Sequence, residues 1–218
     1  MVARKNDVPL LIRRLPVGPY ETNCYMVACM RTLEAFLIDP GAEPDRLLKA
    51  AAGFQVRQIL LTHGHPDHIG ALTEVKAALG APLAYHPLER SLVGTPPDQE
   101  LADGMELLLG DYTLRVLCLP GHTPGGVGFL LGADLFGGDT LFPGGPGHTD
   151  SPDDLAQLVQ TTRDKLFVLP DETVVYTGHG AETTIGRERE ASRAFVARVE
   201  AGWKGCGDLT WESGKQEP

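Results

Sequence analysis

The sequence predicts a mixed α/β fold (α+β class) built as one domain. Short apolar runs bounded by turn residues come first, and later runs of this kind alternate with helical patterns. The chain has 218 residues, of which 42% are hydrophobic and 22% charged, as in one folded globular domain. We therefore expect residues 1–218 to form a single domain that ends in an irregular tail over about residues 203–218.

The first half of the chain predicts short strands and amphipathic helices. The strands are expected over residues 10–15, 23–28, 35–39, 57–61 and 83–85, and the helices over residues 43–52 and 86–93. Another helix is expected directly after His65-Pro66, because apolar residues recur along one face from Ile69 to Leu79 and Gly80 ends the pattern. Residues 94–104 are expected to form a polar loop.

The second half predicts two strand pairs and two longer helices. The strands are expected over residues 105–109, 112–117, 127–131, 135–137 and 173–176, and the last helix over residues 184–201. Another helix begins near Ser151-Pro152, since serine is a favoured N-cap and proline a favoured first helical residue.

Charge and cysteine usage narrow the expected partners and location. The formal net charge of −10 disfavours nucleic acid and anionic membranes as partners, and no apolar run approaches the roughly 20 residues that span a bilayer. The N-terminal 16 residues lack an uninterrupted apolar core, so we expect them to begin the fold and not to be a signal peptide. None of the four cysteines forms a CxxC pair, which favours reduced thiols in a cytoplasmic protein.

Four metal-competent side chains lie within six residues, directly after an expected strand. They are His63, His65, Asp67 and His68. In an extended chain His63 and His65 project to the same side, whereas Asp67 and His68 lie where a helix begins and their side chains turn elsewhere. One tetrahedral ion is hard to surround from so short a segment. Two ions roughly 3.5–4 Å apart are therefore favoured.

Three further residues stand in similar settings, each after an expected strand and preceded by glycine. They are His122, Asp139 and His179. Glycine permits unusual dihedral angles and a close approach of the backbone. A carboxylate can bridge two ions, which makes Asp139 the natural bridge. A histidine in such a loop is more often a turn or core residue, so spacing alone leaves these three residues open as ligands.

The ordered motifs resemble those of the metallo-β-lactamase superfamily over about residues 17–190. The matching segments are His63-Gly64-His65-Pro66-Asp67-His68, Gly121-His122-Thr123-Pro124-Gly125, Gly138-Asp139-Thr140-Leu141-Phe142 and Gly178-His179-Gly180. The resemblance implies a four-layer αβ/βα sandwich of two mixed β-sheets flanked by helices, with the metal site at one edge.

The resemblance also implies how the ligands are shared between two ions. His63, His65 and His122 would hold the first ion; Asp67, His68 and His179 would hold the second; and Asp139 would bridge them. Aspartate at residue 139 differs from the cysteine of the β-lactam-hydrolysing zinc enzymes and is similar to the glyoxalase II (hydroxyacylglutathione hydrolase) branch. The segments at residues 18–25, 38–41 and 183–188 also resemble that branch, in its short single-domain form.

The implied activity is metal-dependent hydrolysis of a small hydroxyacyl thioester. A hydroxide that bridges the ions would attack the carbonyl, and Asp67 would orient it and accept a proton. A thiolate, with an ordinary pKa of about 8.5, leaves without a strong acid. We expect two divalent ions per chain, zinc first, although iron and manganese also suit these ligands. Thr62 and Asp39 are expected to hydrogen-bond the ligand imidazoles.

Two departures from the branch concern the substrate. The chain after His179 is too short for a C-terminal helical thiol-binding domain, and the loop after Asp139 reads Pro146-Gly147-His148 where the branch has Cys-Gly-Arg or Cys-Gly-Lys. His148 is therefore a candidate substrate-binding residue. Two alternatives stay open: a persulfide dioxygenase with one iron, and a metal-stabilised binding protein that is not an enzyme.

Overall fold

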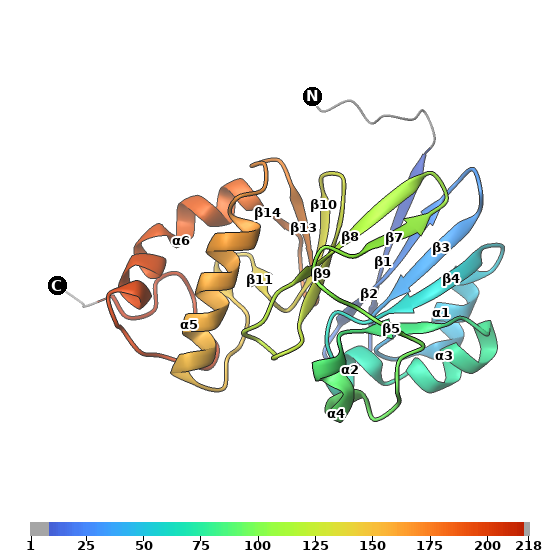
Figure 1. Cartoon of the computed structure of the whole chain (residues 1–218), viewed down its shortest axis with the longest axis horizontal. Helices are drawn as coiled ribbons and strands as arrows, with labels where there is room; N and C mark the ends of the chain where they lie inside the picture. Colours follow the sequence, from blue (N-terminus) through green and yellow to red (C-terminus); the bar gives the residue numbers. More distant parts are fainter. Residues whose placement is uncertain (1–8, 216–218) are drawn as a thin grey trace.

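Two mixed six-stranded sheets lie face to face, with helices on both outer faces (Figure 1). The computed structural model describes residues 9–215. The prediction that residues 1–16 begin the fold therefore falls partly on residues that the structure does not describe. The last three residues of the expected tail also lie outside the described residues. The arrangement confirms the predicted α/β sandwich of two mixed sheets.

The first sheet is formed by the N-terminal half of the chain, in the order β1-β2-β3-β4-β5-β6. Its strands are β1 (Leu10–Val17), β2 (Thr22–Cys29), β3 (Glu34–Ile38), β4 (Gln55–Leu60), β5 (Leu83–Tyr85) and β6 (Gln99–Glu100). Strands β1 to β3 pair antiparallel, and β3 to β6 pair in parallel. Parallel neighbours need crossovers: α1 (Pro44–Ala51) connects β3 to β4, α3 (Leu72–Leu79) lies between β4 and β5, and α4 (Arg90–Val93) lies between β5 and β6.

The second sheet has the order β14-β13-β10-β9-β8-β7. Its strands are β7 (Glu106–Leu109), β8 (Tyr112–Cys118), β9 (Val127–Leu131), β10 (Asp134–Gly138), β13 (Val174–Thr177) and β14 (Thr183–Thr184). Only β10 and β13 pair in parallel, and α5 (Pro152–Thr161), continued by one π-helical turn (Thr162–Leu166), connects them. Helix α5 begins as predicted, because the Ser151 hydroxyl accepts a hydrogen bond from the Asp154 amide at 3.2 Å. Helix α6 (Ile185–Glu200) follows β14.

Three apolar layers hold the four structural layers together. Along β2, successive side chains alternate between two of them: Cys24, Met26 and Ala28 face α1 and α3, while Tyr25, Val27 and Cys29 lie between the sheets. The third layer packs the second sheet against α5 and α6, and it includes Phe195 and Trp211. The stacked sheets thereby fix the ends of β4, β8, β10 and β13 relative to one another.

The structure differs from the prediction in several short elements. The helix expected after His65 is broken into α2 (Pro66–Ile69) and α3. The break arises because the Ala71 amide donates to the Pro40 carbonyl at 3.0 Å, and a Cβ at Gly70 would lie 2.3 Å from the Gly41 oxygen. The segment expected as one helix over residues 86–93 is a 3₁₀ turn (Pro87–Glu89) followed by α4 (Arg90–Val93).

Four strands were not predicted, and each has only two residues. They are β6, β14, β11 (Leu141–Phe142) and β12 (Gly145–Pro146). A two-residue strand has no period that a sequence pattern could reveal. Strand β6 lies within the segment expected to be a polar loop, and β11 and β12 form a small hairpin directly after Asp139.

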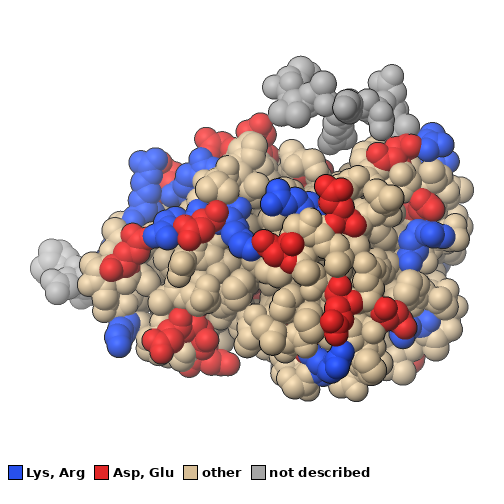
Figure 2. Space-filling view, in the orientation of Figure 1, with Lys and Arg blue, Asp and Glu red and all other residues tan. Residues whose placement is uncertain are grey.

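Charged side chains of both signs are interspersed on the face drawn in Figure 2, without one continuous basic surface. Within residues 9–215, no helix is long and apolar enough to cross a membrane. The four cysteines are free thiols, and Cys24 and Cys29 are buried in the core. That these thiols are reduced stays a prediction.

Candidate metal centre

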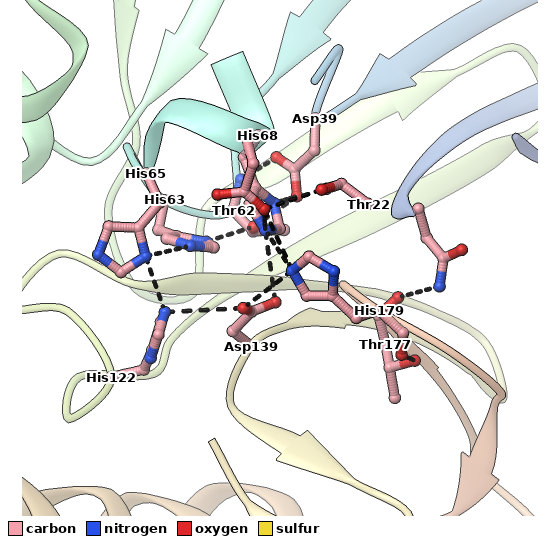
Figure 3. A network of polar contacts seen from close by, with 12 residues as sticks. Thr22, Asp39, Thr62, His63, His65, His68, His122, Asp139, Thr177 and His179 are labelled. Atoms are coloured by element: carbon pink, nitrogen blue, oxygen red, sulfur yellow. Dashed lines mark hydrogen bonds and ion pairs between the residues drawn. The ribbon is translucent and has the colours of Figure 1, made fainter. Parts of the chain in front are cut away.

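All seven candidate ligands converge at one edge of the two sheets. Figure 3 labels six of them, all except Asp67. They come from four places: the segment after β4 with α2, and the loops after β8, β10 and β13. The convergence arises because these strands end at the same edge of the packed sheets. Residues far apart in the sequence, such as His63 and His179, are thereby brought into one cluster.

The first group consists of His63, His65 and His122. The His65 Nδ1 atom lies 3.0 Å from His63 Nε2 and 3.0 Å from His122 Nε2. Two nitrogen ligands on a tetrahedral zinc ion, with bonds of about 2.0–2.1 Å, stand roughly 3.3 Å apart. The three nitrogens therefore have nearly the spacing that one ion requires.

The second group consists of Asp67, His68 and His179. The His179 Nε2 atom lies 3.2 Å from Asp67 Oδ2 and 3.4 Å from His68 Nε2. His68 is completely buried, whereas Asp67 and His179 are partly exposed. Substrate could thus approach this group from the side of Asp67 and His179.

Asp139 lies between the two groups, as Figure 3 shows. Its Oδ2 atom is 3.4 Å from His179 Nε2 and 3.8 Å from His122 Nε2, and its Oδ1 atom is 3.5 Å from His68 Nε2. Oδ1 is buried without a hydrogen-bond partner among the described residues. A buried, unsatisfied carboxylate oxygen is costly unless a ligand completes it. The position and the orphaned oxygen fit a carboxylate shared by two ions.

The outer hydrogen bonds of the histidines set which nitrogen faces the centre. Thr62 Oγ1 lies 3.0 Å from His63 Nδ1, and Asp39 Oδ2 lies 3.0 Å from His68 Nδ1, which confirms both predicted contacts. The Thr62 hydroxyl itself donates to Asp39, so His63 must donate from Nδ1. His122 and His179 likewise donate from Nδ1 to backbone carbonyls. Four Nε2 atoms are thereby left free as ligands, as metal sites require.

Two glycines allow the carboxylate to reach its place. A Cβ at Gly178 would lie 1.9 Å from Asp139 Oδ1. Gly138 has a φ of 51°, and a Cβ there would lie 2.6 Å from the Thr62 hydroxyl. A side chain at either position would displace Asp139 or Thr62, which explains why glycine precedes these ligands.

Thr22 contacts the centre and was not predicted from the sequence. Its hydroxyl donates to Asp67 Oδ2 at 2.8 Å. Thr22 lies at the start of β2, directly after the turn whose Tyr20 carbonyl accepts from His179. One short segment therefore orients two residues of the second group. A lone threonine in a strand carries no sequence signal for such a role.

The two groups differ in charge when no metal is bound. Burial lowers the pKa of His63 and His65, so both are neutral near pH 7. Burial also acts to lower the pKa of His68, but the carboxylates of Asp139 and Asp39 outweigh it and raise this pKa to about 10. The hydrogen bond with Asp139 raises the pKa of His179. Without metal near pH 7, the histidines of the second group therefore carry protons more than His63 and His65 of the first group do.

Metal uptake is expected to depend on pH differently at the two groups. An ion entering the second group at pH 7 displaces at least the His68 proton, so its affinity should rise with pH up to about tenfold per unit until pH 10. The first group needs no proton release from His63 or His65. Chelator-competition titrations of metal-free protein between pH 6 and 9 measure both affinities. Two affinities that rise in parallel would contradict this expectation.

Glu89 is a second residue of the site region that sequence reasoning missed. It is fully buried, and its two carboxylate oxygens accept hydrogen bonds from the amides of Gly64 and Gly125, each at 2.8 Å. Gly64 stands between His63 and His65, and Gly125 is in the His122 loop. One carboxylate therefore ties together the two loops that carry the first group. Its sequence surroundings contain no ligand motif.

Replacing Glu89 with glutamine is expected to lower the affinity of the first group for metal about 10- to 100-fold, because residues that support metal ligands commonly contribute this much. The reason is that an amide offers one acceptor, and its NH₂ group would face an N–H donor. Chelator competition measures both affinities, with Glu100→Gln as control, because Glu100 is exposed and pairs with Arg90. Unchanged affinity at the first group would refute the role.

An open pocket of about 280 Å³ adjoins the second group. Asp139 and His179 line it together with Phe142, His148 and residues 208–210. The His148 ring is half-exposed, with Nδ1 2.9 Å from Asp208 Oδ1, and this hydrogen bond raises the pKa of His148. The structure thus places His148 at the pocket, and its contact with substrate stays a prediction.

Comparison with known proteins agrees with this geometry. Residues 17–179 match the metallo-β-lactamase superfamily. A relative from Haemophilus influenzae named hydroxyacylglutathione hydrolase GloC is 33% identical, over 83% of this chain and 96% of the relative. A solved structure described as TTHA1623 in a di-iron-bound form is 37% identical, with a TM-score of 0.71, over 81% of this chain and 96% of that one.

A second solved structure, ETHE1 from Myxococcus xanthus, is 30% identical with a TM-score of 0.78, over 87% of this chain and 90% of that one. The matched residues 17–179 include all seven candidate ligands. Sequence and structure therefore agree over most of the chain, and the protein belongs to the metallo-β-lactamase superfamily.

Proposed function

We propose that this protein is a metal-dependent hydrolase of small hydroxyacyl thioesters that uses two divalent ions, with zinc as the first candidate. The observation that carries the proposal is the position of Asp139 between two groups of three donors each. The relative named hydroxyacylglutathione hydrolase supports the substrate class. The four free cysteines support a cytoplasmic location.

The residues of the second group would prepare the attacking water. Bound divalent ions supply a water of lowered pKa and polarise the thioester carbonyl. Asp67 is partly exposed, and Thr22 holds its Oδ2 atom beside His179, so its carboxylate can orient the water and accept its proton. His179 is fixed by the Tyr20 carbonyl, which keeps its Nε2 atom directed at the centre.

The leaving group fits a thiol better than an amine. A thiol with a pKa of about 8.5 departs as thiolate without a proton donor. An amine would need one, and among the described residues that line the pocket beside the second group, His148 is the only side chain outside the ligands that can carry a positive charge. Thioester hydrolysis therefore needs no proton donor for the leaving group, whereas amide hydrolysis does.

A hydrolysis assay tests the proposal. Protein loaded with zinc, manganese or iron is given lactoyl thioesters, and thiol release is followed with a thiol reagent. We expect metal-dependent release that a chelator abolishes. No hydrolysis under any metal would overturn the proposal. If protein that holds one iron consumes oxygen when given a thiol persulfide, the protein is a dioxygenase. If protein with a full complement of metal shows neither activity, the binding protein is favoured.

A further inference from the structure

We propose that residues 206–213, here called the C-terminal wall, select the thiol of the substrate by charge. The wall would favour thiols that are neutral or carry an ammonium group over thiols that carry carboxylates. This inference rests on the proposed thioester hydrolysis and deepens it. It depends on how the wall is fixed, where it stands relative to the metal centre, and which charges it presents.

The wall is fastened to the body of the protein by a buried carboxylate. Trp211 is only 5% exposed and packs against Phe195 in the third apolar layer. Its indole Nε1 donates to Glu188 Oε2 at 2.7 Å. The same Glu188 oxygen accepts from the amide of Gly144 at 2.9 Å, and Glu188 is itself buried. One carboxylate thus joins the wall to the loop that follows Asp139.

Backbone contacts fix the rest of the wall. The Gly207 amide donates to the Thr149 carbonyl at 2.7 Å, and the Trp211 amide donates to the Gly144 carbonyl at 2.9 Å. A Cβ at Gly145 would lie 2.4 Å from the Leu209 oxygen, so loop and wall are in close contact. The tail is irregular over these residues, as predicted, and it is held to the body of the protein at Gly207 and Trp211.

The wall forms one side of the pocket beside the metal centre. Asp208, Leu209 and Thr210 line this pocket together with Asp139 and His179. A thioester whose carbonyl reached the second group would place its acyl or thiol portion in this space. Asp208 is the charged residue of the wall that lines this space.

The charges that the wall presents are acidic. None of the described residues that line the pocket is lysine or arginine. His148 is the histidine of the described lining that is not a candidate ligand, and its two ring nitrogens already face carboxylates. Nδ1 lies 2.9 Å from Asp208 of the wall, and Nε2 lies 3.4 Å from Asp150, which precedes α5 and lies outside the lining. Two carboxylates against one imidazole leave excess negative charge, which repels an anionic thiol and attracts an ammonium group.

The size of the effect is limited by solvent. The Asp208 and Asp150 side chains are 93% and 90% exposed, so salt and water screen them. We therefore expect discrimination of several-fold in wild-type protein and a change of roughly tenfold when Asp208 is replaced by lysine, an effect that declines at high salt.

Binding of unreactive thioethers tests the charge selection without turnover. Dissociation constants of S-methylglutathione and S-methylcysteamine are measured by calorimetry on metal-loaded wild type, Asp208→Asn and Asp208→Lys. Wild type should prefer S-methylcysteamine, and Asp208→Lys should shift the ratio toward S-methylglutathione by roughly tenfold. Asp45→Asn is the control, because Asp45 is an exposed acid on α1. A ratio that is equal in wild type and Asp208→Lys would overturn the inference.

Turnover separates this inference from the proposed function. The kcat/KM ratio for the lactoyl thioesters of glutathione and of N-acetylcysteamine should also rise in Asp208→Lys, by a smaller factor than the binding ratio, because N-acetylcysteamine carries no charge. If the variant hydrolyses both thioesters with an unchanged kcat/KM ratio, the charge selection is wrong and the proposed thioester hydrolysis still holds. A shifted binding ratio without any hydrolysis would support the selection and overturn the thioester hydrolase.

Discussion

Replacing Asp139 with alanine is expected to lower kcat/KM for thioester hydrolysis by about a thousandfold or more, and to leave fewer than two ions per chain. The reason is the position of this carboxylate between both donor groups, with one oxygen that has no hydrogen-bond partner among the described residues. Each group keeps its three other donors, so one ion can remain. Elemental analysis and the thiol-release assay on the same samples measure both effects.

A matched aspartate outside the centre serves as the control for this experiment. Asp171 lies in a turn and pairs with Arg189, so Asp171→Ala should keep its metal and its activity. If Asp139→Ala folded normally, bound two ions and hydrolysed thioesters at the wild-type rate, the assignment of a shared ligand would be wrong.

Asp67→Asn is expected to lower kcat about 100- to 1,000-fold while KM changes little, because the amide cannot accept a proton from the attacking water. The amide oxygen can still ligate, so the variant should keep much of its metal. Steady-state kinetics of metal-loaded protein measure the effect. An Asp67→Asn variant with wild-type kcat would exclude this residue as the proton acceptor.

The partner of Asp67 offers a graded comparison. Thr22→Val removes the hydroxyl that donates to Asp67 but keeps the side-chain shape, and we expect a loss of about 10- to 100-fold. Thr22→Ser keeps the hydroxyl and should stay close to wild type. Equal losses of activity in both variants would show that residue 22 acts through its packing and not through its hydrogen bond to Asp67.

The sequence predicted the parts of the site that depend on local spacing. His63 and His65 alternate along an extended segment and Asp67 and His68 follow where α2 begins, and the structure places the four side chains accordingly. Strand ends beside glycine also marked His122 and Asp139. The distribution of ligands between two groups came from the family resemblance, because spacing alone cannot say which distant loops meet.

The residues that sequence reasoning missed act through tertiary contacts. Glu89 lies in a segment without a motif, and it matters only because the loops of Gly64 and Gly125 meet above it. Trp211 lies in a stretch without periodicity. It is buried because its indole donates to Glu188 and its ring packs in the third apolar layer against α6. The break between α2 and α3 depends on the carbonyl of Pro40 in another loop. Local patterns carry no information on such partners.

The most direct test of the account is the rate of lactoyl thioester hydrolysis as metal-free protein is titrated with zinc. Six donors arranged in two groups around Asp139 predict that the rate rises until two equivalents are bound and then stays constant. A chelator should reverse the rise. A plateau at one equivalent, or no hydrolysis at any zinc concentration at which two ions are bound, would contradict a binuclear thioester hydrolase.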